Sequence, residues 1–112
     1  MKLESEELPD GIVRIILSGK LDLAGAHDID APFTAAAAGH RGVIVDLAGV
    51  TFLASMGLRA LVIGAKTATS RGARLVVLGP TPEVEKVLKI SGFYVLAAIV
   101  HDLETALAAA RL

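Results

Sequence analysis

The stretch VTFLASMGLRAL, residues 50–61, changes from a strand-like pattern to a helical one within a few positions. An apolar run with β-branched side chains leads into residues whose apolar positions recur at helical spacing, which predicts a helix over residues 55–70. Ser55 stands at the junction, where a serine hydroxyl often caps a helix by accepting a hydrogen bond from a backbone N–H. The pattern leaves open whether Ser55 is only an N-cap or also a site of modification.

Further strands and helices are predicted on both sides of this junction, separated by glycine and proline. The chain begins with a predicted hairpin, residues 2–8 and 12–17, with the turn Pro9-Asp10-Gly11. The other predicted elements are helices over 24–38, over 83–90 and from an Asp102 cap to 110, and strands over 43–47, 75–78 and 95–100. Strands that are apolar on both faces need helices to bury them. The order ββαβαβαβα therefore predicts a single α/β domain, residues 1–112, with a mostly parallel mixed sheet, an N-terminal edge hairpin and helices packed on the sheet.

Composition and charge exclude several classes of function. The net charge is −1, from 11 basic and 12 acidic residues, which gives no electrostatic attraction to nucleic acid or to anionic lipid. No stretch approaches the roughly 18 apolar residues of a membrane-spanning helix, and the acidic start MKLESEEL is unlike a signal peptide. We expect a cytoplasmic protein that neither binds nucleic acid directly nor inserts into a membrane, and the lack of cysteine agrees with that compartment.

Catalysis is not expected, because no set of catalytic residues converges. Residues 64–67, GAKT, resemble part of a phosphate-binding loop but lie inside the predicted helix, where backbone amides are already bonded. His27, Asp28 and Asp30 point in different directions around a helix, and no second cluster completes a metal shell. The sequence therefore predicts no enzyme, no cofactor and no metal site.

The carboxyl ends of the predicted parallel strands lie along one edge of the sheet, where such folds usually carry their functional sites. This edge would hold Asp22, residues 51–55 and residues 79–81. Because Asp22 directly follows a strand, it can either cap the next helix or meet a basic residue of a partner.

Four segments of the chain, in this order and spacing, resemble the anti-sigma factor antagonists of the STAS domain family. They are SGKLD at 18–22, VIVDL at 43–47, TFLASMGL at 51–58 and ISGF at 90–93. The resemblance implies a four-helix domain with a mixed sheet, in which Ser55 is phosphorylated by a partner that is both anti-sigma factor and serine kinase. It also implies that the dephosphorylated form binds this partner and frees a sigma factor, that phosphorylation breaks the complex, and that a phosphatase is a further partner.

The implied partner-binding surface comprises Asp22, Ala54, Ser55, Met56, Gly57, Leu58 and Arg59. Members of the family usually carry an acidic residue before the serine, a serine or threonine after it and a glycine four positions after it. This chain has Ala54, Met56 and Arg59 there. The altered neighbourhood also fits a non-switching subunit of a signalling scaffold, or of a membrane transport complex for lipids or anions, because STAS-like domains are used in both settings.

Elementary electrostatics supports a switch at Ser55. A phosphate adds about −1.5 to −2 charge beside the free N–H groups and positive dipole of a helix start, where an anion is tolerated, so folding should survive the modification. The same charge in an apolar contact is costly to desolvate, so binding is lost while the domain stays folded. Arg59 lies one turn further on; it either meets an anion, phospho-Ser55 or a partner carboxylate, or extends into water.

Overall fold

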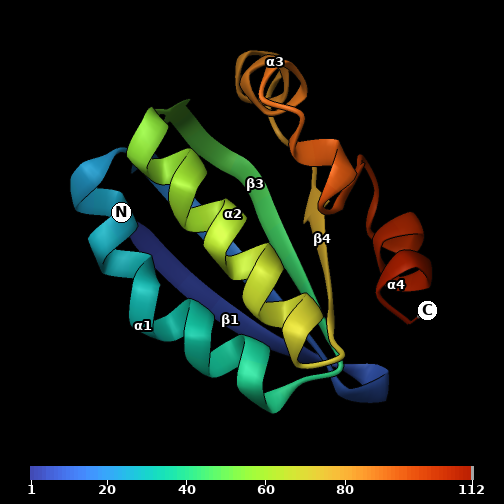
Figure 1. Ribbon diagram of the computed structural model, residues 1–112. Coiled ribbons are helices and arrows are strands. Elements are labelled where there is room, and N and C mark those ends of the chain that lie inside the picture. Colours follow the sequence, from blue (N-terminus) through green and yellow to red (C-terminus); the bar gives the residue numbers. More distant parts are fainter. Residues whose placement is uncertain (112) are drawn as a thin grey trace.

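A computed structural model describes residues 1–111 and shows a five-stranded mixed sheet with four α-helices in that part of the chain (Figure 1). The strands, which lie side by side in chain order, are β1 Lys2–Leu8, β2 Ile12–Leu21, β3 Gly42–Leu53, β4 Arg74–Leu78 and β5 Ala98–Val100. The helices are α1 Leu23–Gly39, α2 Ser55–Ser70, α3 Pro82–Ile90 and α4 Leu103–Arg111. Two 3-10 turns are Pro9–Gly11 and Phe93–Val95. The predicted α/β fold and element order are confirmed.

β1 and β2 form the predicted N-terminal hairpin at one edge of the sheet. They pair antiparallel, starting with Lys2 opposite Ser18. The turn between them needs a left-handed backbone at Asp10 and Gly11, with φ of 67° and 73°. Aspartate and glycine adopt this conformation more readily than most residues, which explains why the Pro-Asp-Gly signal located the turn correctly.

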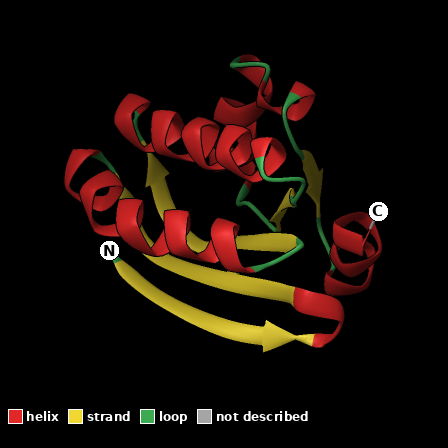
Figure 2. Ribbon diagram, turned by 60° about the horizontal axis from the view of Figure 1, so that its bottom comes forward, coloured by secondary structure: helices red, strands yellow, loops and turns green. Residues whose placement is uncertain are grey.

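β2, β3, β4 and β5 run parallel, and helices cover both faces of the sheet (Figures 1 and 2). α1, α2 and α3 cover one face, where Leu61 and Leu88 belong to the larger core together with Val45 of β3. α4 covers the other face, where Ala106 packs in a smaller core with Ile44. Neighbouring residues of β3 thus point to opposite faces and are both buried, which is why this strand shows no alternation of apolar and polar residues.

β3 is longer than predicted, because it continues to Leu53 instead of ending at Leu47. Beyond Asp46, the last residue paired with β4, it runs on alongside β2, and register shifts keep the pairing up to Leu21 opposite Leu53. Gly49 lies within this extension, and glycine is depleted in strands, so the sequence signal is interrupted there. The extension carries the chain to the start of α2.

Other elements also differ in their bounds from the prediction. β2 continues to Leu21 instead of ending at residue 17. α1 begins at Leu23 and contains Pro32, whose missing N–H removes one backbone hydrogen bond without ending the helix. β5 covers only Ala98–Val100, whereas a strand was predicted from residue 95. The preceding segment instead forms a 3-10 turn, in which the Leu96 N–H donates to the Phe93 carbonyl oxygen at 2.8 Å.

Candidate functional site

Ser55 is exposed and is the first residue of α2. The N-cap position belongs to Ala54, whose backbone is extended (φ −94°, ψ 170°), and no side chain among residues 1–111 caps this helix. The prediction that Ser55 is the N-cap is therefore wrong, because β3 runs to Leu53 and only Ala54 remains between strand and helix. The hydroxyl of Ser55 is consequently not committed to the helix start.

The end of β2 fixes this junction. The Ala54 N–H donates to the Leu21 carbonyl oxygen at 3.1 Å. A Cβ atom on Gly57 would overlap the same carbonyl group, so glycine lets α2 lie directly against the end of β2. Gly57 is buried, and its close approach is to this strand. The contact also brings Asp22, the next residue after Leu21, beside the start of α2.

Asp22 is the N-cap of α1, since its Oδ1 accepts a hydrogen bond from the Gly25 N–H at 3.0 Å. Of the two roles left open by the sequence, capping is confirmed. The segment 79–81 lies at the same edge of the sheet but not at the level of Ser55. β4 stops at Leu78, opposite Asp46, while β3 continues beyond this point to residue 53. Of the three segments predicted to share this edge, Asp22 and the start of α2 therefore lie together, because Leu21 pairs with Leu53, whereas the segment 79–81 lies apart from them along the strands.

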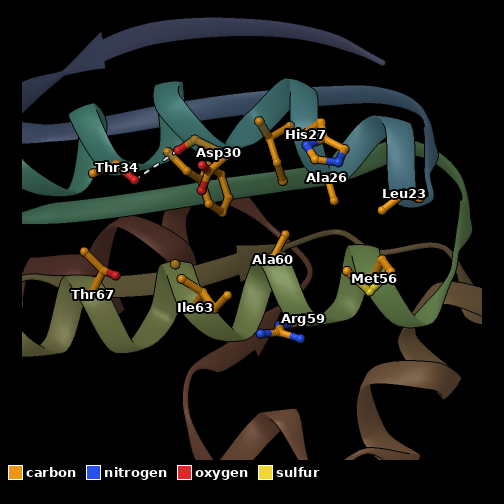
Figure 3. Close-up of a pocket in the computed structure, with 13 residues that line it drawn as sticks. Leu23, Ala26, His27, Asp30, Thr34, Met56, Arg59, Ala60, Ile63 and Thr67 are labelled. Carbon is orange, nitrogen blue, oxygen red and sulfur yellow. Dashed lines mark hydrogen bonds between the residues drawn. The ribbon is translucent and has the colours of Figure 1, made fainter.

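A groove between α1 and α2 begins beside Ser55 and has a volume of about 190 Å³ (Figure 3). The residues that line it come from both helices and include Leu23, His27, Asp30, Met56, Arg59 and Ile63. Of the predicted partner surface, Ser55, Met56 and Arg59 are exposed. Leu58 is half-buried and packs against the larger core, as the apolar stripe of α2 predicts.

The groove itself was not predicted from the sequence. Its signal lies in α2, where Met56, Arg59 and Ile63 recur at helical spacing but are exposed. Apolar residues at that spacing normally face a core, so the pattern does not distinguish a groove from a buried stripe.

The other candidate residues of the sequence do not form a site. No group of three potential metal ligands occurs within residues 1–111, and Asp28 instead lies 3.6 Å from the N-terminal amine of Met1. His40 Nε2 lies 2.7 Å from Glu7 Oε2, and this hydrogen bond raises the pKa of His40. His101 bonds Glu85 at 2.8 Å and lowers the pKa of that carboxyl.

None of the helices in the described part of the chain has the length and hydropathy that crossing a bilayer requires.

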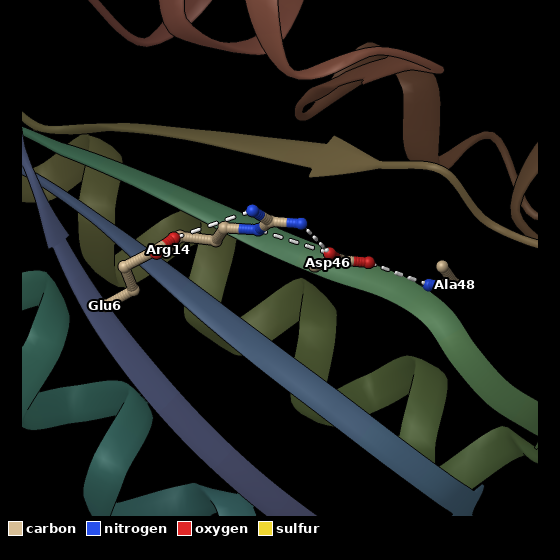
Figure 4. A network of polar contacts seen from close by, with 4 residues as sticks. All are labelled: Glu6, Arg14, Asp46 and Ala48. Atoms are coloured by element: carbon tan, nitrogen blue, oxygen red, sulfur yellow. Dashed lines mark hydrogen bonds and ion pairs between the residues drawn. The ribbon is translucent and has the colours of Figure 1, made fainter.

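A polar network that the sequence did not reveal lies on β2 and β3 (Figure 4). Arg14 donates to Asp46 Oδ2 from Nη2 at 2.7 Å and from Nε at 3.2 Å, and it reaches Glu6 at 3.5 Å. The pair with Asp46 raises the pKa of Arg14. The second oxygen of Asp46 accepts a hydrogen bond from the Ala48 N–H at 3.0 Å. This network holds the point where β3 leaves β4 and its extension toward Ser55 begins.

Comparison with known proteins agrees with this architecture. A family model described as "Mlab, STAS domain" matches residues 5–109. A Bordetella bronchiseptica protein named as a candidate anti-sigma factor antagonist, BtrV, is 32% identical over 110 residues, which are 97% of this chain and 94% of that protein. The chain therefore belongs to the STAS domain family and, within it, to the anti-sigma factor antagonists. These are regulatory proteins and not enzymes, as the sequence predicted.

Solved structures share the fold at lower sequence identity. An anti-sigma factor antagonist from Mycobacterium paratuberculosis superposes with a TM-score of 0.88 at 23% identity, covering 99% of this chain and 94% of that chain. The Bacillus cell fate determinant SpoIIAA in its phosphorylated form superposes with a TM-score of 0.74 at 22% identity, covering 96% and 97%.

Proposed function

We propose that this protein is an anti-sigma factor antagonist that is switched by phosphorylation of Ser55. In its unphosphorylated form it binds an anti-sigma factor with serine kinase activity and thereby releases a sigma factor. The observation that carries the proposal is the position of Ser55: an exposed residue in the first turn of a 16-residue helix that no side chain caps. A kinase can reach this hydroxyl, and the relatives named above supply the class of partner.

The start of α2 can accept a phosphate without unfolding. The first turn of α2 contains no acidic residue, so a phosphate on Ser55 meets the positive end of the helix dipole and no neighbouring carboxylate on that turn. Arg59 lies four residues further along the helix, a spacing at which opposite charges attract each other. The residues that differ from the usual family pattern, Ala54 and Arg59, therefore both favour an anion at Ser55.

The same phosphate would disturb an apolar contact. Leu23, Phe52 and Met56, which surround the start of α2, are 54%, 53% and 41% exposed. A partner that covers these side chains removes water from Ser55 as well, and a group with about −1.5 to −2 charge is costly to desolvate there. Phosphorylation thus ends binding while the domain stays folded.

Two measurements test the proposal. Mass spectrometry of the protein purified from its own host should find phosphate on Ser55. In a binding assay with the anti-sigma factor of that host, Ser55→Ala should bind like the unmodified protein and Ser55→Asp should bind at least about tenfold more weakly. Ser5→Asp, which adds the same charge to an exposed serine of β1, serves as the control and should bind normally.

Removing Arg59 tests its part in the switch. Adding Arg59→Ala to Ser55→Asp and to Ser55→Ala should change the difference in affinity between these two chains, because Arg59 pairs with the anion at position 55. Absence of phosphate from the host protein, together with equal affinities of Ser55→Ala and Ser55→Asp, contradicts the switch and favours a non-switching STAS subunit.

A further inference from the structure

Charges on the outer surface of the helical layer are separated between α1 and α2. α1 carries Asp28 and Asp30 but no lysine or arginine, and α2 carries Arg59 and Lys66 but no aspartate or glutamate. Of these four residues, Asp30 of α1 and Arg59 of α2 line the groove between the two helices, so its two walls carry charges of opposite sign (Figure 3). The net charge of the whole chain is only −1, so two copies repel each other weakly.

Large apolar side chains are exposed along the same groove. Leu23, Met56 and Ile63 are 54%, 41% and 48% exposed, and all three line it. Between them the lining residues are small, including Ala60 and Gly64, so another helix can come close. Covering these side chains removes apolar area from water, which favours association.

We propose that this surface pairs with the same surface of a second copy in a two-fold symmetric dimer, in which α1 of each copy lies on α2 of the other. A two-fold axis that runs parallel to the helices within the interface produces this arrangement. This axis places α1 of one copy, which carries Asp30, on α2 of the other, which carries Arg59. Because the axis is parallel to the helices, the helices of both copies run in the same direction. Each contact then occurs twice, as in any isologous interface.

The positions of the charges along the helices fit this arrangement. In Figure 3 α1 and α2 run in the same direction, and Asp30 lies opposite Ile63. Rotation about this axis leaves the height of each residue along the helices unchanged. Asp30 of one copy therefore meets Ile63 of the other. Arg59 lies about one helical turn before Ile63 and also lines the groove, so it can meet the incoming carboxylate.

Charge complementarity identifies a second copy as the occupant. A helix of uniform sign would meet one helix of like charge at this groove, which is unfavourable. An occupant that suits both walls needs a basic ridge over α1 and an acidic ridge over α2. The α1–α2 pair of a second copy supplies both ridges at the correct spacing.

The dimer covers Met56 and Arg59, which also belong to the partner surface proposed above. Self-association and partner binding would therefore exclude each other. The dimer itself is independent of the proposed function, because its formation requires no partner and no phosphate.

Sedimentation equilibrium of the full chain, over about 1 µM to about 1 mM, tests the proposal. The unchanged protein should show a concentration-dependent equilibrium between monomer and dimer. Arg59→Glu and Asp30→Arg each place like charges opposite each other twice and should raise the dimer dissociation constant at least about tenfold. Lys86→Glu, which changes an exposed charge of α3 outside the groove, should leave it unchanged. Circular dichroism checks that each variant is folded.

Recombination of the two variants makes the test specific. An equimolar mixture of Arg59→Glu and Asp30→Arg chains should form heterodimers, because every 59–30 contact in the mixed pair joins opposite charges. The chain that carries both changes should dimerise with itself for the same reason. A monomer at every concentration, charge reversals without effect, or a failure of both recombinations would each overturn the proposal.

Discussion

Arg14 of β2 and Asp46 of β3 form an ion pair of 2.7 Å that is largely buried, since Asp46 is only 6% exposed. The pair lies on the same face of the sheet as Ile44, opposite the face that α2 covers (Figure 4). Through its second oxygen, Asp46 also binds the backbone of Ala48, where β3 separates from β4. A polar contact on one face of the sheet thus supports the last part of β3. From there the chain continues to Ser55 and α2, which cover the opposite face.

Removing one member of this pair should be strongly destabilising. Arg14→Ala leaves the Asp46 carboxylate buried without its charge partner, and we expect a loss of about 2–4 kcal/mol in the free energy of unfolding. Urea denaturation measures it. Arg111→Ala is the control, because the pair between Arg111 and Asp10 is exposed and should contribute less than about 1 kcal/mol. Equal losses for the two variants would show that burial does not set the strength of the Arg14 pair.

Gly57 should not tolerate a side chain. A Cβ at this position overlaps the Leu21 carbonyl group, which belongs to the backbone and cannot turn away, so Gly57→Ala should cost about 1–3 kcal/mol. Gly39→Ala is the matched control in α1, where none of the described neighbouring atoms lies within 4 Å of the added atom. That variant should be neutral or more stable by up to about 1 kcal/mol, because alanine favours the helix. Thermal unfolding of both variants checks the contrast, and a stable Gly57→Ala protein contradicts it.

Ser55→Ala should leave the stability nearly unchanged. The hydroxyl does not cap α2, so we expect a change below about 0.5 kcal/mol in the free energy of unfolding. Thr81→Ala provides the comparison, since Thr81 does cap α3 by accepting a hydrogen bond from the Val84 N–H at 3.4 Å. Its loss should cost about 1 kcal/mol. If Ser55→Ala lowers the free energy of unfolding more than Thr81→Ala does, Ser55 has a structural role and the prediction is wrong.

The contact between His40 and Glu7 should make the stability depend on pH. The hydrogen bond to Glu7 raises the pKa of His40, so the folded protein holds this proton to a higher pH than the unfolded chain does. The resulting stabilisation is complete below the unfolded pKa of about 6.5 and is lost as the pH rises through the folded pKa. Glu7→Gln should lower the pKa of His40 in an NMR titration and flatten the stability between about pH 6 and 8. Glu4→Gln, whose partner is Lys2, should do neither.

Local signals account for what was predicted correctly. The bounds of α2, residues 55–70, follow from apolar spacing within the helix itself. The cap of α1 at Asp22 and the turn at Asp10 depend on residues within three positions along the chain. Such interactions can be predicted from the sequence because the partners are near neighbours in the chain.

The features that the sequence did not reveal join distant parts of the chain. Arg14 and Asp46 are 32 positions apart, and neither residue type indicates the other. The extension of β3 to Leu53 depends on pairing with β2, and that pairing moves the cap position from Ser55 to Ala54.

The amino-acid order alone specified the succession of strands and helices, the parallel sheet and a serine where β3 gives way to α2. Folding in three dimensions settled that this serine is exposed and not a cap, and that α1 and α2 enclose a groove with one acidic and one basic side. The reason is that helix periodicity and turn preferences are local, whereas burial and the pairing of strands are set by residues brought together from far along the chain.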